Sequence, residues 1–598
     1  MAKRQAQPTR MTEQTLLMYL ALGVLVIGGG GLWVSIQLGY RLAGMTPIPS
    51  GFWDTGLGVL NGTHPWPTES TIVAVVWVTL LATVAVLVLR RVVGRGDGKN
   101  RVDRQAGLMG QGRDIEDVSH RSAMAKAKRM GVASPGVPVG RTVRGNKPLF
   151  GSWEDMHVDI WGPRTGKTTS RAIPAILEAP GAVITTSNKR DVVDATRGIR
   201  EEAGDVWVFD PQRVVDEPAS WWWNPLSYVT DEVKAMKLVE HFVAGSREEG
   251  QSTGDAFWTN SARNLLRGFI LAAALDERPI TDVYRWLARP SKDEAVGILE
   301  DHGYSLQADE VDSVISSPDK QRAGVFGHAQ TFAACLTTRA VAPWIEKQGD
   351  DDERPMFDPV KFVEDGTGTL YSLSLEGEGS SGPLVTALTV AVVEAAEEKA
   401  KRSKGGRLPT PLLAVLDEAA NVCRWARLPQ LYSHFGSRGI VIMTILQSWS
   451  QGCDVWGESG MKKLWSAANI KVYGGGVSET AFLKDLSDLI GPFDRRMTSV
   501  SHTKGQATVS DSLNETAIMD VADLGALPRG RAVVVASGAR PTMVAPQPWM
   551  VSPHAEAVKA SIRRFDPASE ATLEEVAHEA DEVRDEVKDY ENAGGAPL

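Results

Sequence analysis

The sequence has few cysteines and no excess of positive charge. Its 598 residues include only Cys335, Cys423 and Cys453, too few and too widely spaced for a disulfide framework or a zinc cluster. The formal net charge of -10 argues against a protein that coats nucleic acid with its whole surface, although it leaves room for local basic grooves. With 43% hydrophobic and 23% charged residues, the chain has a globular composition and enough length for several domains.

Charge is missing altogether from two long runs near the amino terminus, residues 14–40 and 70–89. Each is long enough to span a bilayer, which takes about 20 residues. A signal peptide would have a shorter apolar stretch ending at a small-residue cleavage site, and neither feature is present. Lys and Arg flank the outer ends of both runs, so both ends are expected in the cytoplasm. Residues 1–95 are therefore predicted to be a membrane anchor of two transmembrane helices with a short extracytoplasmic loop.

Charge is uneven in the rest of the chain. Residues 96–150 are rich in Lys, Arg and Gly, and we expect a loosely structured, basic juxtamembrane segment that contacts either anionic lipid headgroups or nucleic acid. Residues 556–598 are rich in acids. Such a tail is typical of a solvated helix or of disorder, and a partner-docking segment is the alternative.

A phosphate-binding loop is predicted where an apolar run enters Val158–Ser170, which has the sequence VDIWGPRTGKTTS. A P-loop needs this order of strand, glycine-bracketed loop, Gly-Lys-Thr and helix. Its backbone N–H groups and the helix N-terminus face the phosphates, the lysine reaches the outer phosphates, and the threonine hydroxyl binds Mg²⁺. The candidate nucleotide-binding residues are Gly162, Pro163, Arg164, Thr165, Gly166, Lys167, Thr168 and Thr169.

The leading glycine of this pattern is displaced. Trp161 stands five residues before Gly166, where the full motif has glycine, and the first glycine comes one residue later at Gly162. The phosphate-facing Gly166, Lys167 and Thr168 are all in place. Because a bare Gly-Lys-Thr occurs often by chance, the assignment needs support from elsewhere in the chain.

That support comes from an acidic pair, Asp417-Glu418, at the end of the apolar run Pro411–Leu416. In a parallel sheet the pair would follow a strand beside the P-loop. Asp417 could then hold Mg²⁺ together with Thr168, and Glu418 could orient and deprotonate the attacking water. A buried strand followed by an exposed acidic turn is the simpler alternative.

The order of apolar runs predicts an α/β fold with a parallel sheet. Strands are expected over Met156–Trp161, Gly181–Thr186, Asp205–Phe209, Gly368–Leu375, Pro411–Leu416, Ile440–Leu446, Asn469–Tyr473, Arg531–Ala536 and Thr542–Ala545. Helical periodicity replaces the strand pattern between the third and fourth of them. We therefore divide the nucleotide-binding domain into residues 151–228 and 351–555, separated by an all-α insertion at residues 229–350.

Gln447 is a further candidate because it follows the expected strand Ile440–Leu446. An amide at that position could sense the γ-phosphate or the attacking water. It could equally be a simple strand cap, and the residues alone leave both interpretations open.

Together these features resemble the type IV coupling proteins of conjugation and type IV secretion, the TraG/TraD group. The resemblance covers nearly the whole chain. It rests on the two amino-terminal runs, the P-loop, Thr186-Ser187-Asn188-Lys189, Phe209-Asp210-Pro211, Asn224-Pro225-Leu226, the helical insertion, Asp417-Glu418 and Leu446-Gln447-Ser448, including the spacing from the acidic pair to Gln447.

The resemblance implies a RecA-like ATPase that uses ATP and Mg²⁺ and forms a homo-hexamer in the cell membrane. Its implied role is to deliver single-stranded DNA, bound to a relaxase, to the components of a type IV secretion channel. It also implies an arginine, placed just before the glutamine strand, that acts on the nucleotide of a neighbouring subunit. Arg438 is the candidate, although it lies two residues out of register, and Arg424 and Arg427 compete with it.

Two other functions fit the same residues. An FtsK-like translocase of double-stranded DNA would also be a membrane-anchored P-loop ring, but the carboxy terminus shows an acidic tail in place of a basic winged-helix module. A receptor for secreted proteins could instead use nucleotide only as a switch, without motor activity. Stimulation of ATP hydrolysis by DNA would distinguish a motor from such a receptor.

Overall fold

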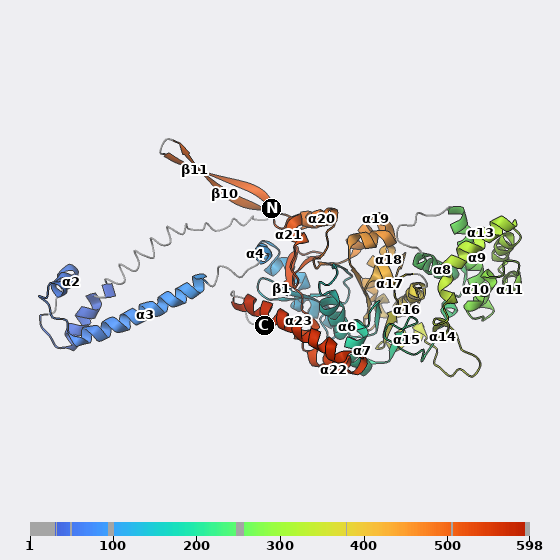
Figure 1. The fold of residues 1–598 in the computed structure, drawn as a ribbon, viewed down its shortest axis with the longest axis horizontal. Helices are drawn as coiled ribbons and strands as arrows, with labels where there is room; N and C mark the ends of the chain where they lie inside the picture. The colour runs from blue at the N-terminus through green and yellow to red at the C-terminus, as the bar shows by residue number, and fades with distance from the viewer. Residues whose placement is uncertain are drawn as a thin grey trace. The chain divides into compact units, whose positions relative to one another are not determined.

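The computed structural model describes residues 30–31, 33–47, 51–93, 101–246, 256–377, 380–503 and 506–592 (Figure 1). The chain divides into two compact units. The larger contains residues 101–491 and 517–587, and the smaller contains the amino-terminal residues up to 100 with residues 492–516 and 588–597. Each unit is described by itself below.

An eleven-stranded mixed sheet forms the centre of the larger unit, in the order β2-β1-β13-β12-β9-β3-β8-β7-β4-β6-β5. The strands from β9 to β5 run parallel, whereas β12, β13, β1 and β2 extend the sheet in antiparallel pairs. The bounds are β1 Val137–Thr142, β2 Pro148–Gly151, β3 His157–Ile160, β4 Val183–Ser187, β5 Val206–Phe209, β6 Thr369–Leu373, β7 Leu412–Leu416, β8 Ile440–Leu446, β9 Ile470–Tyr473, β12 Ala532–Ala536 and β13 Thr542–Ala545.

The central parallel strands are buried along their whole length, as their continuous apolar sequences require. Helices cover them, among them α6 (Ile173–Glu178), α7 (Asp191–Ala203) and α16 (Gly382–Arg402). The predicted α/β fold with a parallel sheet is confirmed. The ends of the predicted strands differ from the observed ones by about two residues at most, the usual uncertainty of an element boundary.

The expectation of a loosely structured basic segment is wrong for residues 101–150. They form α4 (Arg101–Gln105), α5 (His120–Arg129), the edge strand β2 and its neighbour β1. Val137, Val139 and Leu149 of these strands are buried against the rest of the sheet. The high density of Lys, Arg and Gly hid a short period-two apolar pattern, which is the pattern of a strand with one buried face.

Between β5 and β6 the larger unit carries the helices α8 (Glu232–Gly245), α9 (Ala256–Leu275), α10 (Thr281–Leu287), α11 (Glu294–Asp301), α12 (Ser305–Ile315), α13 (Asp319–Phe332) and α14 (Ala342–Ile345). They gather at one end of the unit, coloured green in Figure 1. The long helix α9 is their centre, and it packs against α8, α11, α12 and α13. Its Leu265 and Phe269 are buried in this packing.

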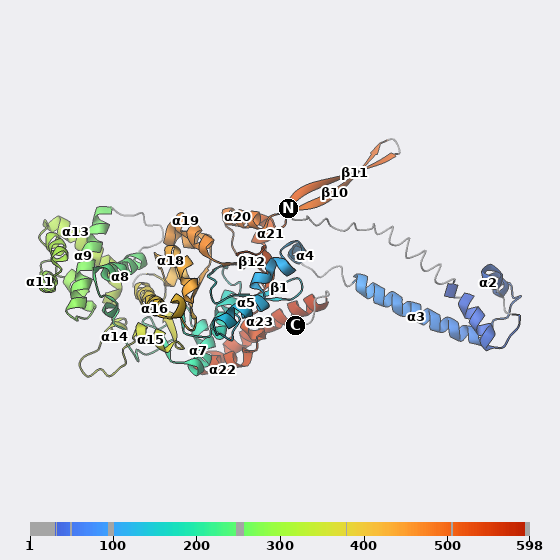
Figure 2. The same ribbon diagram turned by 180° about the vertical axis from the view of Figure 1, so that it is seen from behind.

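The acidic carboxy-terminal region forms two helices, which agrees with the expected helix and not with disorder. Helix α22 (Ala555–Phe565) lies along α7, as both ribbon views show (Figures 1 and 2), and α23 (Ser569–Asn592) follows it. Val558 and Ile562 of α22 and Ala580 of α23 join a core cluster with Ile173 of the P-loop helix. Apart from Ala580, the side chains described for α23 are exposed or half-buried, as the expected solvated helix requires.

The smaller unit contains α2 (Phe52–Leu60), α3 (Thr68–Val93) and a hairpin of two twelve-residue strands, β10 (Pro492–Thr503) and β11 (Gln506–Ala517), which we did not predict. The expected span at residues 70–89 falls on α3, and much of the span at 14–40 lies outside the described residues. Among the helices that the structure describes, none combines the length and the apolar character needed to cross a bilayer. Both spans stay predictions.

Candidate functional site

The predicted P-loop leaves the carboxyl end of β3 and returns into α6 through a π-helical turn, Thr168–Ala172. The regular α-helix that follows begins at Ile173. Within the loop, Arg164 and Gly166 have left-handed backbone conformations, with φ of +58° and +86°. The Thr165 hydroxyl closes the loop by donating to the Gly162 carbonyl oxygen at 2.5 Å. Left-handed residues help to turn successive N–H groups inward, as an anion-binding loop requires.

The displaced glycine has a structural explanation in a second glycine run, Gly474-Gly475-Gly476, which follows β9. The Trp161 indole is buried against Gly474, where a Cβ atom would lie 2.1 Å from the ring. At the next position Gly162 approaches the backbone of Gly476 so closely that a Cβ on Gly162 would lie 2.1 Å from the Gly476 oxygen. The bulk added by Trp161 is thus accommodated by glycine after the adjacent strand.

A buried ion pair fixes the start of the P-loop helix to its strand. The Arg171 Nε donates to Asp159 Oδ2 at 2.6 Å, and neither side chain is exposed. The guanidinium also lies 3.3 Å from His157 Nδ1 and donates to the Pro138 carbonyl oxygen. Burial, with the Arg171 charge beside it, holds the pKa of His157 well below its ordinary value, so the imidazole is neutral. These contacts were not predicted, because they join residues of β1, β3 and the P-loop helix.

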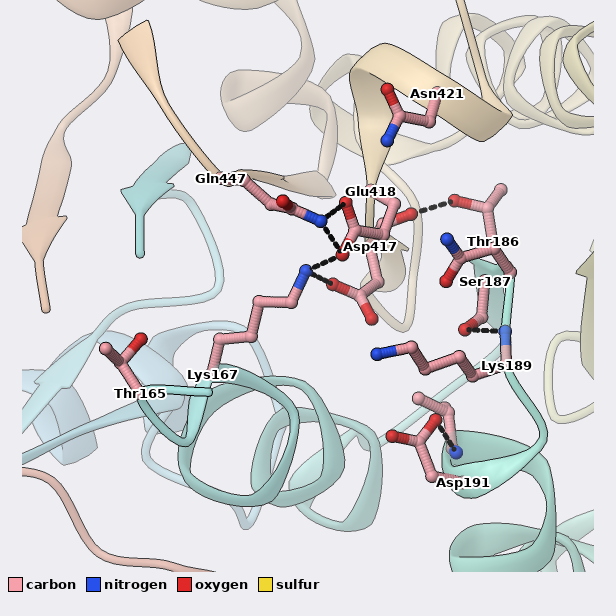
Figure 3. A network of polar contacts seen from close by, with 12 residues as sticks. Thr165, Lys167, Thr186, Ser187, Lys189, Asp191, Asp417, Glu418, Asn421 and Gln447 are labelled. Atoms are coloured by element: carbon pink, nitrogen blue, oxygen red, sulfur yellow. Dashed lines mark hydrogen bonds and ion pairs between the residues drawn. The ribbon is translucent and has the colours of Figure 1, made fainter. Parts of the chain in front are cut away.

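The acidic pair lies where the sequence predicts, directly after β7. Glu418 has a left-handed backbone, with φ of +53° and ψ of +43°, an uncommon conformation for a residue with a side chain. The Lys167 ammonium binds the Glu418 carboxylate and lies 3.5 Å from Asp417 Oδ1 (Figure 3). Both acids are almost completely buried, and the Lys167 side chain is only 12% exposed. The structure therefore brings the predicted lysine and both predicted acids into one cluster.

Asp417 is a suitable metal ligand. Burial raises its pKa to about 6, an effect that Lys167 opposes and the charge of Glu418 reinforces. Its Oδ1 is buried and has no well-formed hydrogen bond among the residues that the structure describes. The Lys167 ammonium lies 3.5 Å from this oxygen. An under-satisfied, buried carboxylate oxygen costs free energy that a cation would recover, and carboxylate and hydroxyl oxygens are ligands that Mg²⁺ prefers. Asp417 therefore fits the predicted Mg²⁺ site, and the part of Thr168 in that site stays a prediction.

Gln447 contacts the same cluster from the end of β8. Its Nε2 donates to both carboxylate oxygens of Glu418, at 2.8 Å each (Figure 3). Because β3, β8 and β7 are successive strands of the sheet, Lys167, Gln447 and Glu418 follow three adjacent carboxyl ends. A plain strand cap would bond only to nearby backbone, so this geometry favours the functional interpretation. The role of Gln447 itself stays a prediction.

A second group of polar residues borders the cluster from β4. The Thr186 hydroxyl donates to the Asp417 carbonyl oxygen at 3.2 Å, and Lys189 and Asp191 follow on the way into α7 (Figure 3). Asp191 is the first residue of α7 and is exposed, and its Oδ1 accepts a hydrogen bond from the Val192 backbone N–H at 2.9 Å. Asp191 was missed, because an acid at a helix start is ordinarily interpreted as a cap.

Arg438 lies elsewhere. It precedes β8, whereas Gln447 follows that strand, so the length of β8 separates Arg438 from the cluster in its own chain. There its guanidinium pairs with Glu397 of α16. The structure does not bring Arg438 to this site, and action on the nucleotide of a neighbouring subunit stays a prediction.

Comparison with known proteins agrees with the predicted resemblance. Residues 411–529 match the family model described as the "TraM recognition site of TraD and TraG". This segment begins at β7 and includes both acids and Gln447. A search of curated proteins found no match. The family model thus confirms the predicted resemblance to the TraG/TraD group over residues 411–529.

Solved structures share the fold. The bacterial conjugative coupling protein TrwBdeltaN70, in an unbound form, matches with 18% identity and a TM-score of 0.50, over 71% of this chain and 91% of that one. Its complex with sulphate matches with 16% identity and a TM-score of 0.50, over 71% and 92%. A structure of TrwB with ADP and Mg²⁺ matches with 17% identity and a TM-score of 0.49, over 71% and 91%. At identities this low, the two matches with a TM-score of 0.50 show the fold alone.

Proposed function

We propose that this chain is a membrane-anchored ATPase that acts as the coupling protein of a conjugative DNA-transfer system. The observation that carries the proposal is the cluster at three adjacent strand ends, where Glu418 contacts both Lys167 and Gln447. A buried lysine, two acids and an amide at the mouth of a glycine loop are the groups that phosphoryl transfer from a nucleotide to water requires. The family match over residues 411–529 supports the cellular role.

In this proposal the loop Gly162–Thr169 binds the ATP phosphates. The Lys167 ammonium, which pairs with Glu418 in the structure, moves to the outer phosphates when ATP binds. Glu418 then loses its cationic partner and is free to orient a water and accept its proton. Gln447, bonded to both Glu418 oxygens, holds that carboxylate in place and reports on the outer phosphate. Arg438 of a neighbouring subunit is the candidate for stabilising charge on the transferred group.

Mg²⁺ would be held by Thr168 and Asp417, and when bound it supplies positive charge against the phosphate oxygens. The Asp417 carboxyl must be ionised to serve as a ligand. Because its pKa is about 6, nucleotide binding with Mg²⁺ is expected to weaken as the pH falls below that value.

In the wider role that we propose, residues 1–95 anchor the protein in the membrane with both termini in the cytoplasm. The chain assembles into a homo-hexamer. The transported partner is single-stranded DNA with its relaxase, delivered to components of a type IV secretion channel. The description of the matched family model supports a protein of the TraM kind as a further partner of residues 411–529.

Hydrolysis of ATP by the purified full-length chain, with and without DNA, tests this function. We expect single-stranded DNA to raise the rate more than double-stranded DNA, and the rise to shrink steeply between about 50 and 200 mM salt because binding releases counterions. Stronger stimulation by double-stranded DNA would favour an FtsK-like translocase. No stimulation by either form would favour the nucleotide-switched receptor.

A further inference from the structure

Glu376 is an exposed acid that none of the predicted motifs includes, yet it bonds to residues beside the catalytic cluster. It follows β6, and one of its oxygens, Oε1, accepts two hydrogen bonds. The donors are the side-chain amides of Asn421, at 2.7 Å, and Asn188, at 3.0 Å. Two segments that follow different strands thus meet on one carboxylate oxygen.

The first of these bonds, from Asn421, holds the turn that carries Glu418. Asn421 belongs to α17 (Ala419–Val422), a helix of four residues that starts immediately after Glu418. The backbone N–H of Asn421 donates to the Glu418 carbonyl oxygen at 2.9 Å, and Figure 3 shows both side chains on this turn. A helix this short has little stability of its own. The left-handed backbone of Glu418 therefore depends on contacts that hold α17 in place.

The second bond, from Asn188, holds the loop that follows β4 on the other side of the cluster. Asn188 follows Ser187, the last residue of β4, and precedes Lys189 on the same loop. Two residues before Asn188, the Thr186 hydroxyl donates to the Asp417 carbonyl oxygen. Glu376 consequently bridges the loop that follows β4 and the turn that carries the two acids.

Gln212 holds a residue on each side of Glu376 in the sequence. The Gln212 side-chain oxygen accepts hydrogen bonds from the backbone N–H groups of Leu375, at 2.9 Å, and Ser381, at 3.2 Å. Glu376 and Asn421 also line a cleft of about 780 Å³, together with residues of the all-α insertion. The bridge therefore borders both this cleft and the turn that follows Glu418.

We propose that Glu376 is a positioning residue, which holds Glu418 in its working orientation through Asn421 and the four-residue helix α17. This inference rests on the proposed ATPase function. It assigns Glu376 no contact with nucleotide, so its loss acts on turnover and leaves nucleotide binding intact.

The test is the dependence of ATP hydrolysis on ATP concentration for the full-length chain. Glu376→Ala should lower kcat roughly ten- to a hundred-fold, the range expected when a catalytic group is displaced, with KM for ATP changed by less than about twofold. Glu376→Gln, which keeps an oxygen that can accept from both amides, should retain most of the wild-type kcat. Glu202→Ala, at an exposed acid on α7, is the control and should behave as wild type.

A paired substitution separates positioning from a general loss of structure. Asn421→Asp places a second carboxylate against Glu376 and should lower kcat. Adding Glu376→Gln should restore it, because the glutamine amide can donate to the new carboxylate while its oxygen still accepts from Asn188. A wild-type kcat for Glu376→Ala, or no restoration in the double variant, would overturn the inference. If the wild type itself hydrolyses no ATP, the proposed function fails and this inference falls with it.

Discussion

Replacing Asp417 by asparagine should make the folded protein more stable at neutral pH while removing its activity. The carboxyl is buried, and its pKa is raised from 3.8 to about 6. A carboxyl with a higher pKa in the folded than in the unfolded chain stabilises the fold while it is protonated. That contribution is lost as the pH rises from about 4 through about 6. The amide of the variant does not titrate, so the stability difference between the two proteins must depend on pH.

The size of this stability difference follows from the change in the pKa of Asp417 on folding. A difference of about two pH units, at about 1.36 kcal/mol each, gives roughly 3 kcal/mol between low and neutral pH. For a cooperative unit of several hundred residues this corresponds to a change in Tm of roughly 3 °C. Acids that do not interact with Asp417 titrate alike in both proteins and cancel in the difference.

Thermal unfolding of the wild type and of Asp417→Asn, without nucleotide, from about pH 4 to about pH 8 measures this difference. The stability of the variant relative to the wild type should increase as the pH rises from about 4 to about 6, and the difference should level off above about pH 6. Glu202→Gln, at an exposed position on α7, should show no pH-dependent offset. An offset for Asp417→Asn that is the same at every pH would refute the argument, because it would mean that Asp417 is not desolvated.

Three further predictions concern the loop, the amide and the amino terminus. Gly474→Ala places a Cβ 2.1 Å from the Trp161 indole, so overpacking should lower the free energy of unfolding by about 1–3 kcal/mol and weaken ATP binding. Gly525→Ala, where the new Cβ would meet only ordinary contacts, is the control and should change neither the stability nor ATP binding. Gln447→Ala removes both bonds to Glu418 and should lower kcat roughly ten- to a hundred-fold with little change in ATP affinity, as measured by steady-state hydrolysis and equilibrium binding. Removal of residues 1–95 should give a soluble protein that associates with itself more weakly, as measured by analytical ultracentrifugation; an unchanged oligomer would contradict an anchoring role for this segment.

The parts of the site that the sequence predicts are those built from local patterns. Lys167 and the pair Asp417-Glu418 each follow an apolar strand sequence, and the carboxyl ends of parallel strands meet at one edge of a sheet. The strand order that makes β3, β8 and β7 neighbours was not needed for this expectation. Gln447 followed from the same reasoning. Its two hydrogen bonds to Glu418 could not be foreseen, because they depend on where two strands end.

The contacts that the sequence does not predict join residues far apart in the chain. Trp161 looked like a defect of the P-loop, because its partner Gly474 lies far downstream and three glycines in a row are typical of any loop. Residues 137–151 form two strands although their charge and glycine content indicated a loose segment. Glu376 and Asp191 carry no motif, and only the fold brings them to the cluster.

The central claim is that Glu418 accepts the proton of the attacking water in an ATP site built on Lys167. Measuring ATP affinity and single-turnover hydrolysis together for the wild type, Lys167→Ala and Glu418→Gln tests it most directly. We expect hydrolysis by the wild type, loss of both binding and hydrolysis in Lys167→Ala, and wild-type ATP affinity without turnover in Glu418→Gln. Turnover near the wild-type rate in Glu418→Gln would contradict the assignment of the base, and near-normal hydrolysis by Lys167→Ala would contradict the site itself.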